Sequence, residues 1–158
     1  MAEGLHLLPS VGGPVQTPRE DGPNETILVA EDAVPIRKMV CAMLAQSGYR
    51  CLEASDGRDA LDMIHAAPRA IHLLLTDVIM PNVGGIELAR RVSRLNPEMR
   101  ILFMSGYSDD PVVRSIERSP GIFLAKPFTA AALLDKVRDM LAAPWTGLPE
   151  TNSGAGAR

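Results

Sequence analysis

The sequence has 158 residues, of which 46% are hydrophobic and 22% are charged, a composition typical of a globular domain with one core. The net charge of −3 at pH 7 offers no basic surface to a phosphate backbone, so nucleic-acid binding is not expected. No apolar run approaches the roughly 18 residues of a membrane span, and no signal peptide is recognisable. We therefore expect a cytoplasmic protein without membrane contact.

The first half of the chain begins its regular pattern after a Gly- and Pro-rich arm at residues 1–24. A short apolar strand is predicted at 27–30, followed by a helix that Pro35 starts. Gly48 ends this helix, and a second strand follows at 50–54. Its weaker alternation indicates an edge strand. Asp56 and the glycine after it then lead into the next helix.

The second half of the chain repeats the strand and helix alternation three more times. Its central strand is an apolar run that ends in Thr76 and Asp77, which is typical of a strand buried on both faces. Thr129 is a suitable N-cap for the last helix. The predicted strands are at 73–77, 100–105 and 122–125, and the predicted helices are at 85–95, 111–119 and 130–143.

The alternation of strand and helix predicts an α/β fold with helices on both faces of one parallel sheet. We expect the flavodoxin-like (βα)5 arrangement, with five strands in the order 2-1-3-4-5. The folded domain is predicted to cover residues 25–143. Residues 1–24 are expected to form a flexible arm or linker, and residues 144–158 a disordered C-terminal tail.

The two cysteines, Cys41 and Cys51, are too few for a disulfide framework. Neither has the spacing of a metal ligand pair, which argues against zinc. We therefore expect two separate buried thiols in a reducing compartment.

Four of the five predicted strands end in polar residues. The first is followed by Glu31 and Asp32, the third ends in Asp77, the fourth in Ser105, and the fifth is followed by Lys126. The carboxyl ends of parallel strands share one edge of the sheet, so these side chains are expected to meet there. Clustered carboxylates require a cation, and an oxygen-only ligand set suits Mg²⁺. A carboxylate such as Asp77 can attack phosphorus, while Lys126 neutralises charge on the transferred group.

These residues, together with Pro81 and the Pro-Phe pair after Lys126, resemble the receiver domain of two-component response regulators. The resemblance covers about residues 25–143. It implies that Asp77 is the phosphoacceptor, which takes a phosphoryl group from the phosphohistidine of a histidine kinase or a histidine phosphotransfer protein. It also implies that Mg²⁺ is held by Asp32, Asp77 and the backbone carbonyl of Ile79, with Glu31 acting mainly through a coordinated water.

The same resemblance implies a conformational switch. Ser105 matches the switch hydroxyl and Phe123 the switch aromatic, and the bond between Lys126 and Pro127 is expected to be cis. Phosphorylation is then expected to change the face formed by the fourth helix, the fifth strand and the fifth helix. Phe123 departs from the commoner tyrosine and has no hydroxyl to bond with.

Two positions that tune hydrolysis in this family hold the bulky residues Ile79 and Tyr107. Both are poorly suited to orienting an attacking water, so a long-lived phosphoryl group is predicted.

Several functional alternatives remain open at the level of sequence. The domain is either a stand-alone regulator or the receiver of a hybrid histidine kinase, since residues 5–9, followed by a Pro-rich linker, resemble the end of a kinase ATP-binding domain. The chain by itself is expected to accept a phosphoryl group without being a turnover enzyme. An Mg²⁺-dependent phosphatase with an aspartate nucleophile is a competing reading, but Ile79 stands where its general acid is needed. A third hypothesis is a pseudo-receiver that binds partners and is never phosphorylated.

Overall fold

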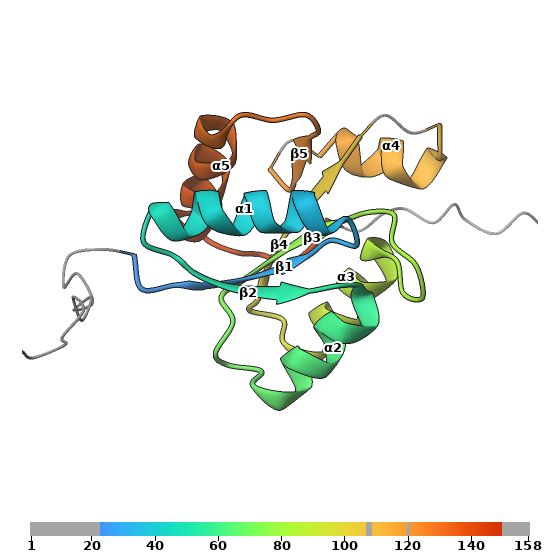
Figure 1. Ribbon diagram of the computed structural model, residues 1–158. Coiled ribbons are helices and arrows are strands. Elements are labelled where there is room, and N and C mark those ends of the chain that lie inside the picture. The colour runs from blue at the N-terminus through green and yellow to red at the C-terminus, as the bar shows by residue number, and fades with distance from the viewer. Residues whose placement is uncertain (1–22, 107–108, 120, 150–158) are drawn as a thin grey trace, which may run out of the picture.

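The structure is a computed structural model that describes residues 23–106, 109–119 and 121–149 (Figure 1). Five parallel strands form one sheet in the order β2-β1-β3-β4-β5, which confirms the predicted order. The strands are β1 (Thr26–Ala30), β2 (Arg50–Ala54), β3 (Leu73–Asp77), β4 (Arg100–Ser105) and β5 (Phe123–Ala125).

Helices alternate with these strands, as the sequence predicts. In Figure 1, α1 and α5 lie on one side of the sheet, and α2 and α3 lie on the other. No helix in the described ranges is both long and apolar enough to cross a bilayer. The helices are α1 (Val34–Gln46), α2 (Gly57–Ala66), α3 (Gly85–Leu95), α4 (Pro111–Glu117) and α5 (Ala130–Ala142).

The central strand β3 anchors the core. All five of its residues are buried, because both faces of the strand are covered by helices. In β2, by contrast, exposed and half-buried positions alternate and only Ala54 is buried, as expected for an edge strand. The parallel register brings the carboxyl ends of β1, β3, β4 and β5 to one edge, which places the polar strand ends together.

Side-chain caps fix where three helices begin. Asp56 accepts a hydrogen bond from the Asp59 backbone at the start of α2, and Thr129 accepts one from Ala132 at the start of α5. Asp110 caps α4 in the same way and is followed by Pro111. The short predicted helix is confirmed, since α4 has seven residues.

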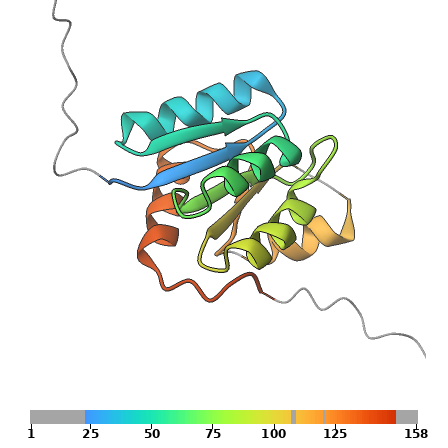
Figure 2. The same cartoon turned by 90° about the horizontal axis from the view of Figure 1, so that it is seen from below.

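The prediction of a disordered tail from residue 144 is wrong for residues 144–149. The indole nitrogen of Trp145 donates a hydrogen bond of 3.1 Å to the carbonyl of Pro97, and Arg100 donates one of 3.0 Å to the carbonyl of Ala143. Trp145 also packs on the core. These contacts hold the C-terminal segment against the end of the sheet opposite the polar strand ends (Figure 2). Residues 150–158, and residues 1–22 of the predicted arm, lie outside the described ranges.

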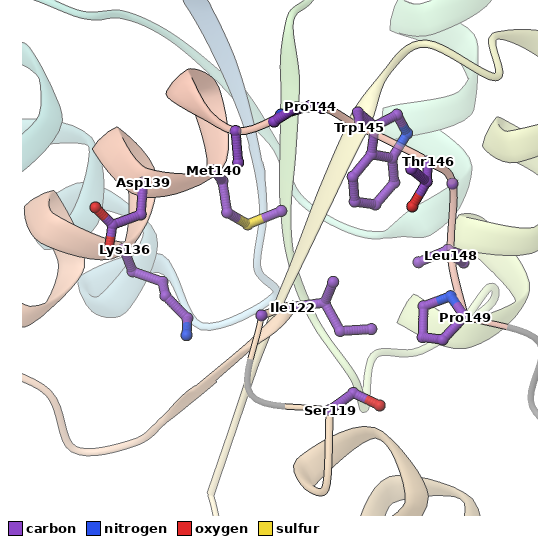
Figure 3. Close-up of a pocket in the computed structure, with 13 residues that line it drawn as sticks. Ser119, Ile122, Lys136, Asp139, Met140, Pro144, Trp145, Thr146, Leu148 and Pro149 are labelled. Carbon is purple, nitrogen blue, oxygen red and sulfur yellow. The ribbon is translucent and has the colours of Figure 1, made fainter.

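A pocket of about 610 Å³ lies between this C-terminal segment and α5 (Figure 3). Ile122, Met140 and Trp145 form much of its apolar lining, while Lys136 and Asp139 lie on its polar side.

The prediction of two separate buried thiols is also wrong. Cys41 on α1 and Cys51 on β2 are joined in a disulfide, with Cα atoms 5.7 Å apart. Both residues are only half-buried. The pairing arises because α1 packs against the edge strand β2, a contact that cysteine counting does not reveal.

Candidate functional site

Asp77, the last residue of β3, lies at the centre of the polar edge. The chain continues along β4 for one more residue, since the backbone N–H of Val78 donates to the carbonyl of Met104. The start of α3 then packs directly against Asp77. A Cβ atom at Gly85 would lie 2.0 Å from the Asp77 carbonyl oxygen, so only glycine permits this contact. The backbone at the end of β3 is therefore held from both sides.

Three carboxylates gather at this edge. Glu31 and Asp32 follow β1, the neighbour of β3 in the sheet, and each offers a ligand oxygen within 4.8 Å of the others and of Asp77. The Glu31 side chain is only 1% exposed, and one of its oxygens accepts a hydrogen bond from the backbone of Ala33 at 3.1 Å. Asp32 is exposed. The cluster thus has a buried inner acid and an outer acid open to solvent.

Lys126 reaches this cluster from β5, two strands away from β3. Its ammonium nitrogen lies 2.6 Å from Glu31 Oε2 and 3.2 Å from Asp77 Oδ2. The Lys126 backbone N–H donates to the carbonyl of Ser105, which extends the pairing of β4 and β5 to the edge. The bond between Lys126 and Pro127 is cis, as predicted. One lysine therefore bridges two of the three carboxylates.

The surroundings raise the pKa of both Glu31 and Lys126. Burial raises the pKa of the Glu31 carboxyl above its ordinary value, and the charge of Asp77 acts in the same direction, while hydrogen bonds from Lys126 and Ala33 oppose it. Burial would lower the pKa of Lys126, but its hydrogen bond to Glu31 and the nearby charges of Asp77 and Glu31 outweigh burial and raise it. Three carboxylates beside one ammonium thus leave the site short of positive charge.

The donor set fits a hard divalent cation. Its side-chain ligand atoms are carboxylate oxygens, of which those of Asp32 are exposed and those of Asp77 are largely buried. Glu31 is already engaged by Lys126 and Ala33. Mg²⁺ commonly binds one or two carboxylates and keeps several of its waters. An acidic edge with one exposed carboxylate leaves room for those waters, so it suits Mg²⁺.

The remaining predicted residues surround the cluster. Ser105 is buried, and its hydroxyl donates a hydrogen bond of 3.1 Å to the carbonyl of Gly106. The Ile79 backbone N–H lies 3.4 Å from Asp77 Oδ1, while its side chain is 63% exposed. Phe123 is half-buried beside β4, paired with Phe103. Tyr107 lies outside the described residues.

Two further contacts support the site and were missed from the sequence. The Arg37 guanidinium donates a hydrogen bond of 2.7 Å to the backbone carbonyl of Glu31. Asn82, in the loop after Asp77, donates one of 2.7 Å to Asp56. The only sequence signal was the turn-forming character of Asn82, which has a φ of 65°.

Comparisons with known proteins agree with this geometry. Residues 27–138 match the family described as response regulator receiver domain. The response regulator receiver protein CpdR of Brucella abortus is 32% identical over 123 residues, which cover 74% of this chain and 97% of CpdR.

Some relatives are much longer than this chain. The sensor kinase CckA of Brucella abortus is 31% identical over 117 residues, which cover 73% of this chain but 12% of CckA. Among solved structures, the chemotaxis response regulator CheY4 of Vibrio cholerae matches with a TM-score of 0.64 and 27% identity, over 75% of this chain and 99% of CheY4. The matching region therefore occurs both as a nearly whole protein and as a small part of a kinase.

Proposed function

Because this chain belongs to the receiver domain family of two-component response regulators, we propose that Asp77 is its phosphoacceptor. The observation that carries the proposal is the position of Lys126, whose ammonium contacts both Asp77 and the buried Glu31. A carboxylate oxygen of Asp77 attacks phosphorus as the bond from phosphorus to the donor histidine breaks. Lys126 places positive charge beside the oxygens that gain negative charge.

The same proposal assigns Mg²⁺ to the acidic edge, with Asp32, Asp77 and the backbone carbonyl of Ile79 as its ligands. Bound Mg²⁺ neutralises charge on the transferred phosphoryl group. Glu31 holds Lys126 in place and would act on the ion mainly through a coordinated water. Asp32, which is exposed, is the carboxylate best placed to approach an ion from solvent.

The signalling step is proposed to involve Ser105 and Phe123. The Ser105 hydroxyl bonds to Gly106 in the structure, and on phosphorylation it turns to donate to a phosphoryl oxygen. Phe123 lies one strand further out and follows this movement, which alters the surface of α4, β5 and α5. Phosphorylation adds a charge of about −1.5 to −2, and this charge favours the switched state.

The partners on this proposal are a histidine kinase or a histidine phosphotransfer protein as donor, and a protein as target, in the cytoplasm. Both a stand-alone regulator and the receiver of a hybrid kinase fit. The matching region makes up 97% of the receiver protein CpdR but only 12% of the sensor kinase CckA.

The test is incubation of the protein with Mg²⁺ and acetyl phosphate, read by intact mass. We expect one phosphoryl adduct, which is absent when Asp77→Asn is used and when EDTA removes the metal. Asp62→Asn, which changes an exposed carboxyl on α2, is the matched control and retains the adduct. A wild-type protein that never gains the adduct contradicts the proposal and favours a pseudo-receiver.

The lifetime of the phosphoryl group is a separate prediction. The exposed Ile79 side chain stands beside Asp77 and has no polar group to orient an attacking water, so slow hydrolysis is expected. Loss of the adduct after removal of acetyl phosphate measures this rate. Ile79→Asn, which introduces an amide, is expected to shorten the half-life. A wild-type half-life of only seconds contradicts the prediction, and rapid release of inorganic phosphate with turnover favours the phosphatase.

A further inference from the structure

The edge strand β2 contributes no side chain to the acidic cluster, yet the residues at its carboxyl end contact both loops that carry the cluster. We call residues 53–57 the β2 end. The first of the two loops that the β2 end contacts joins β1 to α1 and contains Glu31 and Asp32. The other joins β3 to α3 and contains Ile79 and Asn82.

The first contact is between Asp56 and Asn82, which are 26 residues apart. The Asn82 side-chain nitrogen donates a hydrogen bond of 2.7 Å to Asp56 Oδ2. The other oxygen of Asp56 accepts a hydrogen bond of 2.8 Å from the Asp59 backbone and caps α2. One carboxylate therefore ties the loop after Asp77 to the start of a helix that the core holds in place.

Backbone packing strengthens this contact. A Cβ atom at Gly57 would lie 2.2 Å from the carbonyl oxygen of Val83, so the start of α2 lies directly against the loop. At its far end, the same loop is held because Gly85 donates a hydrogen bond of 2.8 Å to the carbonyl of Val78. Ile79 thus lies in a loop whose two flanks are both fixed.

The second contact involves the loop after β1. The backbone N–H of Glu31 donates a hydrogen bond of 3.2 Å to the carbonyl of Ala54. Arg37 donates from its guanidinium to the carbonyl of Glu31 and forms an ion pair of 3.4 Å with Glu53. The N–H of Glu31 is therefore held by Ala54 of the β2 end, and its carbonyl is held by Arg37, which is itself paired with Glu53 of the β2 end.

From these contacts we propose that the β2 end positions both loops of the phosphoacceptor site, with Asp56 as the positioning residue for the loop that carries Ile79. This inference rests on the proposed function, because it concerns the geometry in which the loops receive Mg²⁺. Asp56 itself touches neither the ion nor the phosphoryl group. Its loss is expected to weaken Mg²⁺ binding while the chemical groups of the site stay intact.

The experiment compares Asp56→Ser with Asn82→Gly. Serine is as good a helix N-cap as aspartate, but its side chain is too short to cap α2 and also reach Asn82. Glycine tolerates the positive φ at position 82. We expect each variant to raise the Mg²⁺ dissociation constant measured by calorimetry roughly tenfold, the size of effect seen for outer-shell partners of metal ligands. The rate of phosphorylation by acetyl phosphate at saturating Mg²⁺ is expected to change little.

Two further readouts separate positioning from general stability. Compared with the metal-free wild type, the metal-free variants are expected to show faster hydrogen exchange in residues 78–83 and unchanged exchange in the core strands. The double variant is expected to bind Mg²⁺ no more weakly than either single variant, because both remove the same bond. Asp56→Asn, which keeps the cap and can still pair with the Asn82 amide, is expected to retain near wild-type affinity.

Asp62→Ser on the exposed face of α2 is the matched control for loss of one negative charge, and it is expected to leave Mg²⁺ affinity unchanged. Wild-type Mg²⁺ affinity in both Asp56→Ser and Asn82→Gly, with unchanged exchange in residues 78–83, overturns the inference. An equal loss of affinity in Asp62→Ser also overturns it, because the effect is then one of charge alone. Failure of the wild-type protein to accept a phosphoryl group counts instead against the proposed function.

Discussion

The two ends of the parallel sheet are stabilised in opposite ways. At the carboxyl end, Asp77, Glu31 and Asp32 crowd together around the single ammonium of Lys126. At the other end, the C-terminal segment closes the sheet with the hydrogen bonds from Trp145 to Pro97 and from Arg100 to Ala143, and with apolar packing, and no carboxylates crowd together in these contacts. The first arrangement concentrates unbalanced charge, and the second buries surface. Function is therefore expected to depend on the carboxyl end, and the opposite end is expected to contribute only stability.

The largest expected effect comes from removal of the ammonium at the carboxyl end. Lys126→Met leaves Glu31 buried without a cation, and breaking a buried ion pair in this way lowers the free energy of unfolding by about 3 kcal/mol. Phosphoryl uptake by Asp77 is expected to be lost as well. Denaturant unfolding and intact mass after acetyl phosphate treatment measure the two effects.

Lys38→Met provides the matched control for Lys126→Met. The Lys38 side chain is 63% exposed and pairs with Glu53 at the surface, so its loss is expected to cost less than about 1 kcal/mol and to leave phosphoryl uptake intact. Equal stabilities of the two variants would show that the carboxyl end does not hold unbalanced charge.

A smaller effect is expected at the opposite end of the sheet. Trp145→Ala removes a half-buried indole and its hydrogen bond to Pro97, which is expected to lower the free energy of unfolding by about 2 kcal/mol, less than the cost for a fully buried tryptophan. Phosphoryl uptake is expected to stay at the wild-type level. Reduced uptake in a folded Trp145→Ala protein would mean that the two ends are coupled.

Sequence patterns predicted one end of the sheet much better than the other. The apolar runs determined the strands, and the shared edge of a parallel sheet then brought Asp77, Ser105 and Lys126 together. The C-terminal segment was missed because one tryptophan among Pro, Gly and Thr has no periodicity. Its partner at Pro97 is 48 residues away, and only the folded chain brings the two together.

The supports around the site were missed for a related reason. The bonds from Arg37 to the Glu31 carbonyl and from Asn82 to Asp56 each join a side chain to a group in another loop or element. Such contacts depend on rotamers and loop paths, which residue spacing does not encode. The cysteines were misjudged similarly, since their number argues against a disulfide while the packing of α1 on β2 brings Cys41 and Cys51 together.

The smallest expected effect is a pH dependence of the free energy of unfolding. It distinguishes the carboxyl end, where Asp56 is a titratable support, from the opposite end, where Trp145 is not. The hydrogen bond from the Asp59 backbone, together with that from Asn82, lowers the pKa of Asp56 below its ordinary value. A lowered pKa means that Asp56 contributes stability above the unfolded-state pKa of about 3.9, and that this stability is lost as pH falls through the folded-state pKa.

Asp56→Ala is therefore expected to lower the free energy of unfolding by about 1 kcal/mol at neutral pH, the usual cost of a lost N-cap. The difference from wild type is expected to shrink as the pH falls below about 4. The deficit of Trp145→Ala involves neutral groups, so it is expected to stay constant over the same range. Denaturant unfolding of the three proteins at a series of pH values measures both trends, and a pH-independent deficit in Asp56→Ala would contradict a charged support at the carboxyl end.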